Sequence, residues 1–165
     1  MSLLDNLEAL NQAAKLRPPN AIVPYHDGFV QMIEPRGTDA LFFEHVPEFH
    51  KVISHYSTLG PAFVGVHAGK PKCIFGAVQL WQSVAEIWMI TDESLPEYAL
   101  PFQRSTKAFI EILMDELQLF RLQFTVHSEN ILAVKWAKSL YFIEEGIMRK
   151  MGPDGADFHL FARVK

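Results

Sequence analysis

Apolar residues follow a helical period at the start of the chain. Between residues 2 and 16 they recur every three or four positions, which predicts one face of a helix. The sequence RPPN comes next and cannot continue a helix, because proline lacks an N–H. We therefore expect an N-terminal helix and linker over residues 1–20, ahead of a main domain over residues 21–165.

Helical and strand-like patterns then mix along the main domain. Residues 28–35 alternate apolar and polar positions and predict a first strand. The elements predicted after it are two helical pieces over 36–56, three strands over 60–91, a helix over 101–118, a strand over 119–127, a helix over 128–140 and a hairpin over 141–164. This order predicts an α/β (α+β) sandwich built on one mostly antiparallel sheet.

Composition and charge argue against several classes of function. The 165 residues carry enough apolar side chains for one core, and the net charge of −4 gives no basic surplus for binding nucleic acid. No apolar run approaches the roughly 20 residues that cross a bilayer, and the N-terminus lacks a signal-peptide pattern, so we expect a soluble, cytoplasmic protein. Cys73 is the single cysteine, and His45, His50 and His55 do not converge on a helix, so we expect no disulfide and no metal site.

Two stretches carry the motifs of a known family. The first is VAEIWMI, and the second is HSENILAVKWAKSLYFIEEGIMRK, in which the motif positions are Asn130, Ala133, Phe142, Glu145 and Gly146. With the long helix between them, they resemble the Gcn5-related N-acetyltransferases (the GNAT superfamily) over about residues 28–164. The resemblance implies the GNAT fold, a mixed, mostly antiparallel sheet of six to seven strands flanked by helices, here with an extra N-terminal helix. The EIW strand and the later GPDG turn also resemble a group of tailed-phage GNAT-like proteins, often described as internal virion proteins.

The resemblance implies an N-acyltransferase that uses acetyl-CoA as cosubstrate and an unidentified amine as acceptor. GNAT enzymes bind the cofactor where two parallel strands splay apart, here residues 86–91 and 122–127. Backbone groups of Met89, Ile90 and Thr91 would then pair with the pantetheine arm.

The remaining cofactor contacts implied by the resemblance come from two helices. The pyrophosphate would lie where the helix near Pro101 begins, because free N–H groups there favour an anion. Arg104 would add positive charge, and Lys138 would either meet a nucleotide phosphate or belong to a solvated face. Asn130 would hydrogen-bond the cofactor arm, or it would only help to start a helix.

Glu86 and Tyr141 are the candidate catalytic residues. The resemblance makes Glu86 the general base, and desolvation on an apolar strand would raise its pKa; alternatively it lies on the solvent face or pairs with a basic residue. Ala137 stands where many GNAT enzymes carry a tyrosine that acts as general acid for the leaving thiolate. Tyr141, which replaces the usual glycine before Phe142, would either supply that phenol or pack against the core.

The loop DESLPEYALPFQRSTK departs from the family pattern. It contains no glycine to wrap a phosphate, and Asp92, Glu93 and Glu97 bring negative charge to it. Two functions therefore stay open. One is a phage-encoded N-acyltransferase with a degenerate pyrophosphate loop, working in the host cytoplasm or carried in the virion. The other is a catalytically inactive GNAT fold that serves as an internal virion protein or binds a phage or host protein.

Overall fold

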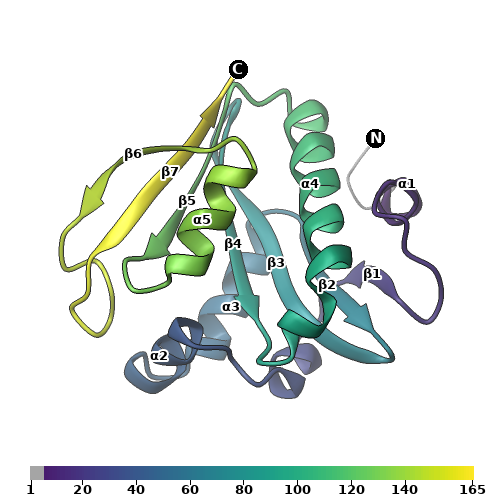
Figure 1. The fold of residues 1–165 in the computed structure, drawn as a ribbon, viewed down its shortest axis with the longest axis horizontal. Coiled ribbons are helices and arrows are strands. Elements are labelled where there is room, and N and C mark those ends of the chain that lie inside the picture. Colours follow the sequence, from purple (N-terminus) through teal and green to yellow (C-terminus); the bar gives the residue numbers. More distant parts are fainter. Residues whose placement is uncertain (1–5) are drawn as a thin grey trace.

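The computed structural model describes residues 6–165 and contains one seven-stranded sheet in the order β1-β2-β3-β4-β5-β7-β6 (Figure 1). The strands are β1 Ala21–Pro24, β2 Ala62–His67, β3 Lys70–Trp81, β4 Val84–Thr91, β5 Arg121–His127, β6 Ile143–Met148 and β7 Phe158–Val164. The helices are α1 Leu7–Ala13, α2 Thr38–His45, α3 Phe49–Thr58, α4 Ala99–Glu116 and α5 Ile131–Ser139, with short 3-10 helices at Asp27–Met32 and Leu95–Tyr98. Only β4 and β5 pair in parallel, so the predicted α/β fold with a mostly antiparallel sheet is confirmed.

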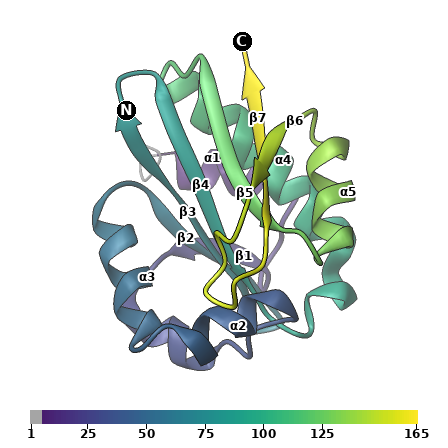
Figure 2. The ribbon, with the colours of Figure 1, turned by 90° about the vertical axis from the view of Figure 1, so that its left-hand side faces the viewer.

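Helices cover both faces of the sheet. Helices α1, α4 and α5 lie on one face, and Figure 2 shows α2 and α3 on the other. Neighbouring side chains on a strand point to opposite faces, so each strand feeds both layers. Phe63 and Phe75 belong to the core beneath α4, whereas Val64 and Ile74 belong to a second core beneath α3. Among residues 6–165, no helix is both long and apolar enough to cross a membrane.

The strand predicted over residues 28–35 is wrong. Residues Asp27–Met32 form a 3-10 helix, and the edge strand β1 lies earlier, at the start of the main domain, where no element was predicted. Val30 and Ile33 both reach the second core, and their spacing of three residues is the period of a 3-10 helix. The buried positions therefore follow a helical spacing and not the period of two that a strand requires.

Helix α1 packs against the main domain. Leu10 and Ala14 are fully buried in the core beneath α4. The Asn11 side chain accepts the Ile22 N–H at 2.7 Å and donates to the Ile22 carbonyl at 2.9 Å, which joins α1 to β1. The first residues of the helix predicted from residue 2, residues 2–5, lie outside the described part of the chain, and the division at residue 20 stays a prediction.

Candidate functional site

Strands β4 and β5 form a fork. They pair only from Val84 opposite Arg121 to Glu86 opposite Gln123, and then diverge, as Figure 1 shows. The later half of β4 therefore has β3 on one side and the opening of the fork on the other. This opening lies where the resemblance places the pantetheine arm.

The backbone of β4 turns alternate residues toward the fork. Asp92 donates its N–H to the Lys72 carbonyl of β3, which means that Ile90 also faces β3 and that Met89 and Thr91 face the fork. Of the three β4 residues predicted to pair with the pantetheine arm, Met89 and Thr91 thus present backbone groups to the opening, and Ile90 is buried in the second core.

Thr91 already has partners from the segment that begins α2. Its N–H donates to Asp39 Oδ2 at 2.8 Å, its hydroxyl donates to the same oxygen at 2.6 Å, and its carbonyl accepts the Arg36 N–H at 2.9 Å. Burial raises the pKa of Asp39, and the hydrogen bonds from Thr91 partly oppose that shift. Among the predicted cofactor contacts on β4, Met89 is therefore the one whose fork-facing backbone is not tied to α2.

Glu86 lies at the apex of the fork on the face opposite α4 and α5. Leu122 and Phe124 point into the core beneath α4, so Gln123 between them points to the other face. Gln123 Nε2 donates to Glu86 Oε2 at 2.8 Å. Trp88, two residues along β4, is on this face too and lies 6.0 Å from the Tyr56 ring of α3. Glu86 is partly buried and opens toward the α3 layer.

A chain of polar contacts extends from Glu86 across the sheet. Arg121 Nε donates to Gln123 Oε1 at 2.8 Å, and the Arg121 guanidinium makes two bonds to Glu145 of β6, at 3.0 and 2.6 Å. The bonds from Arg121 lower the pKa of Glu145, and the same contact raises the pKa of Arg121. The chain fixes the amide of Gln123 so that its N–H groups face Glu86.

Asn130 links the start of α5 to the start of α2. Its Oδ1 accepts the Ala133 N–H at 3.1 Å, which is an N-cap, and its Nδ2 donates to Thr38 Oγ1 at 3.3 Å. Because Asp39 holds the end of β4, the first residues of α2 span the wide end of the fork from β4 to α5. Figure 1 shows α2 below the ends of both strands.

Aromatic side chains fill the space between α4 and α5 on the other face. Trp136 of α5 stacks on Phe102 of α4, with ring centroids 5.4 Å apart and planes at 21°, and its edge meets Phe124 of β5. The indole Nε1 of Trp136 is buried without a hydrogen-bond partner. This pair lies between α4 and α5 and against β5.

The other predicted site residues lie away from Glu86. Arg104 donates from Nε to the Ala14 carbonyl at 3.2 Å, so it faces α1 rather than α5. Lys138 is exposed near the end of α5, with Nζ 3.8 Å from Glu144. Tyr141 lies on the α4 face beside Lys107 and Arg163, whereas Glu86 lies on the opposite face.

The conformation of Tyr141 explains its place in the chain. Its φ of 65° is left-handed, and its side chain is 71% exposed. The Tyr141 N–H bonds the Lys138 carbonyl and the Phe142 N–H bonds the Ala137 carbonyl, which together form a Schellman motif that ends α5. Glycine adopts this conformation most easily, and that is the residue the family usually has there.

The loop between β4 and α4 satisfies its own backbone. Asp92 accepts bonds from the Glu34 and Ser94 N–H groups, and its backbone carbonyl accepts the Leu95 N–H. These amides therefore do not converge on a phosphate. The first-turn amides of α4 remain, with Pro101 contributing none, and Tyr98 makes no side-chain cap there.

Four residues of this site were missed from the sequence: Thr38, Asp39, Arg121 and Gln123. Thr38 and Asp39 belong to a segment that precedes the fork by some 50 positions, and no local pattern joins the two. Gln123 and Arg121 stand at polar positions of an alternating strand, which is a signal for an exposed sheet face but not for a hydrogen-bonded chain.

Comparison with solved structures identifies the fold, although no known protein family and no curated protein matches the sequence. Ard1 from Thermoplasma volcanium superposes with a TM-score of 0.71 at 15% identity, covering 88% of this chain and 97% of that one. A GNAT-family acetyltransferase from Bacillus anthracis gives 0.67 at 14% identity, covering 88% and 94%. A GNAT acetyltransferase from Elizabethkingia anophelis, solved with acetyl-CoA bound, gives 0.65 at 14%, covering 90% and 100%. The chain therefore has the GNAT fold.

Proposed function

We propose that this protein is an N-acyltransferase that transfers an acyl group from acetyl-CoA to an amine. The observation that carries the proposal is the position of Glu86, a hydrogen-bonded carboxylate at the apex of a fork between two parallel strands. The fold is also one shared with acetyltransferases, including one that binds acetyl-CoA.

Glu86 would act as general base. An amine is protonated near neutral pH and becomes nucleophilic when it loses a proton. Glu86 would take one proton from the ammonium group, and the neutral nitrogen would then bond to the thioester carbon. The carbon–sulfur bond breaks, and CoA leaves as the thiol with the second proton that the nitrogen gives up. The N–H of Met89 faces the fork and supports a role in holding the pantetheine arm or the developing negative charge on the thioester oxygen. The amine would approach from the α3 face, past Trp88 and Tyr56.

The residues fit the cofactor in part. The first-turn amides of α4 suit the pyrophosphate, but Asp92, Glu93 and Glu97 repel it and the loop amides already have partners. The Tyr141 side chain lies beside Lys107 and Arg163, and Arg104 donates to the Ala14 carbonyl of the segment after α1, so neither contact offsets this repulsion. We therefore expect weak binding of acetyl-CoA, at tens to hundreds of micromolar, roughly 5–6 kcal/mol of binding free energy.

A second candidate function is a GNAT fold without catalysis. The stacking of Trp136 on Phe102 favours it, because this pair joins α4 to α5 on the face of the sheet beside β5. Under this second candidate, and given the resemblance to tailed-phage proteins, the protein would be an internal virion protein or would bind a host protein.

Turnover separates the two candidates. Purified protein would be incubated with acetyl-CoA and a panel of primary amines, and thiol release would be followed. If the protein is an acyltransferase, we expect turnover that Glu86→Gln lowers by about a hundredfold or more. Glu8→Gln on α1 is the control and should leave the turnover rate unchanged. Absence of thiol release above background with every amine would favour the second candidate.

A further inference from the structure

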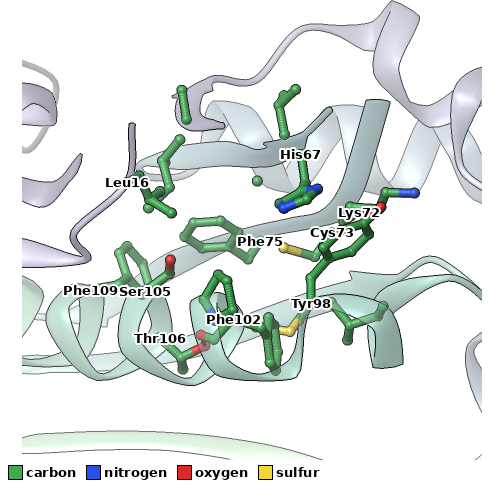
Figure 3. Close-up of a pocket in the computed structure, with 17 residues that line it drawn as sticks. Leu16, His67, Lys72, Cys73, Phe75, Tyr98, Phe102, Ser105, Thr106 and Phe109 are labelled. Atoms are coloured by element: carbon green, nitrogen blue, oxygen red, sulfur yellow. Dashed lines mark hydrogen bonds between the residues drawn. The ribbon is translucent and has the colours of Figure 1, made fainter. Parts of the chain in front are cut away.

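The two edges of the sheet differ in how they are covered. At the β1 edge, the Asn11 side chain of α1 accepts the Ile22 N–H and donates to the Ile22 carbonyl. Leu16, in the segment after α1, lies with Ile22 in the wall of the pocket beneath α4 that Figure 3 shows. The other edge is β6, and within residues 6–165 only β7 pairs with it. An uncovered edge strand offers N–H and C=O groups that pair with another chain.

Large apolar side chains lie exposed along the β6 edge. Four of the six residues of β6 are exposed, among them Ile143 at 72% and Ile147 at 58%. Met151, which follows the strand, is 56% exposed. A single exposed apolar side chain is ordinary, but these three recur every four residues along one edge and mark it as a contact surface.

The charges of the same stretch are divided between its two ends. Residues 143–151 read IEEGIMRKM, so Glu144 and Glu145 precede the centre, whereas Arg149 and Lys150 follow it. Within residues 6–165, the side chains of Arg149 and Lys150 form no ion pair, and both residues are exposed. The edge is therefore acidic at one end and basic at the other.

The two glutamates have partners within the chain but keep room for another. Glu145 meets Arg121 at 2.6 Å, and Glu144 meets His159 at 2.7 Å and Lys138 at 3.8 Å. Their side chains remain 37% and 31% exposed. A carboxylate accepts about four hydrogen bonds, so each of them can also meet a cation from outside.

We propose that β6 pairs antiparallel with β6 of a second copy of this protein, about a two-fold axis at Ile147. In this register Ile147 lies opposite Ile147 of the second copy, and Gly146 lies opposite Met148. A closed two-fold dimer uses the same surface on both copies, so the surface must be complementary to itself. The bulge of β6 lies between Glu144 and Gly146, before these central pairs.

The flanking residues match in this register. Ile143 lies beside Met151 of the second copy, and residues 144–145 lie beside its residues 149–150, so apolar meets apolar and acid meets base. The chain turns at residues 149–150, so their long side chains make this contact and their backbone does not. Pairing about the middle of β6 would instead bring the glutamates of both copies together. This surface goes beyond the proposed acyl transfer and does not depend on it.

Sedimentation equilibrium of the full chain measures the association. Because the central pairs are few, we expect a reversible dimer with a dissociation constant of about 10–100 μM, weakened by salt. Arg149→Glu with Lys150→Glu makes the whole edge acidic and is expected to weaken the dimer at least tenfold. Lys15→Glu with Arg17→Glu makes the same change of charge at exposed positions after α1 and should leave the dimer unchanged.

A cysteine at the centre locates the interface. Cys73 is the single natural cysteine and is buried, so Ile147→Cys adds an accessible thiol without a competitor. Facing residues of antiparallel strands have Cα atoms about 4.5–5.5 Å apart, which suits a disulfide. Mild oxidation should therefore link Ile147→Cys into a covalent dimer, whereas Ile131→Cys, similarly exposed on α5, should stay mainly monomeric.

Three results would each overturn the proposal. The first is a natural protein that stays monomeric at millimolar concentration. The second is a dimer that the charge reversal at residues 149–150 weakens no more than its control. The third is Ile147→Cys that cross-links no faster than Ile131→Cys. Far-UV circular dichroism checks that each variant is folded, and the natural protein with the two cysteine variants decides the outcome if the charge-reversed variant is not.

Discussion

Replacing Asn130 with alanine tests what this residue does in the folded protein. The change removes the N-cap bond to the Ala133 N–H and the bond from Nδ2 to Thr38 Oγ1, and it leaves the rest of α5 intact. An N-cap replaced by alanine costs about 1 kcal/mol. The contact with Thr38 is long, 3.3 Å, so we place it at the low end for a neutral hydrogen bond, about 0.5 kcal/mol. The free energy of unfolding should therefore fall by about 1.5 kcal/mol.

Two companion variants separate the two bonds. Asn130→Asp keeps a capping oxygen, and that oxygen can accept from the Thr38 hydroxyl, so the loss should be within about 0.5 kcal/mol of zero. Thr38→Val removes only the link to α2, and combining it with Asn130→Ala should show a coupling of about 0.5 kcal/mol. Urea unfolding followed by far-UV circular dichroism measures each value. If Asn130→Ala left the stability unchanged, or if Asn130→Asp cost as much as alanine, the assignment of Asn130 as a structural cap would be refuted.

Three further predictions concern the backbone, the pH dependence and the loop. Tyr141→Gly should raise the free energy of unfolding by about 1 kcal/mol, because the residue has a left-handed φ and an exposed side chain, whereas Tyr141→Phe should be neutral in urea unfolding. Burial raises the pKa of Asp39 above its usual 3.8, so its contribution to stability is complete below pH 3.8 and is lost as the pH rises through the folded-state pKa. The free energy of unfolding of the natural protein, relative to that of Asp39→Asn, should therefore fall as the pH rises over that interval. Urea unfolding at several pH values measures this difference, and a difference that does not change with pH would contradict the prediction. The double change Glu93→Gln with Glu97→Gln should tighten acetyl-CoA binding two- to fivefold at low salt and have little effect at about 0.5 M salt; equal affinities at low salt would place the pyrophosphate elsewhere.

Most of the fold follows from local patterns in the sequence. The three strands over residues 60–91 and the long helix after them were predicted because their apolar periods are strong and their turns carry recognisable residues. Residues 21–35 were misread, because a short edge strand and a 3-10 helix are decided by pairing with β2 and by packing on α3, not by their own pattern. The helix predicted over residues 128–140 begins at Ile131, because the Asn130 side chain accepts the Ala133 N–H and acts as the N-cap.

The candidate site was less predictable than the fold. Resemblance found the two strands of the fork, but the contacts that decide what enters it come from far away in the sequence. Asp39 takes the Thr91 N–H across 52 residues, and Gln123 reaches Glu86 across 37. The stacking of Trp136 on Phe102 depends on how α4 and α5 approach each other, which periodicity along either helix does not specify.

Calorimetric titration with acetyl-CoA tests the central claim, that the fork receives a CoA thioester, most directly. Met89→Pro removes an N–H that faces the fork and spares the bonds to β3, and Met89→Leu serves as its control; thermal unfolding confirms that both are folded. We predict binding of acetyl-CoA at tens to hundreds of micromolar to the natural protein and to Met89→Leu, and binding at least tenfold weaker to Met89→Pro. Absence of heat at millimolar acetyl-CoA, or equal binding by folded Met89→Pro, would contradict the account.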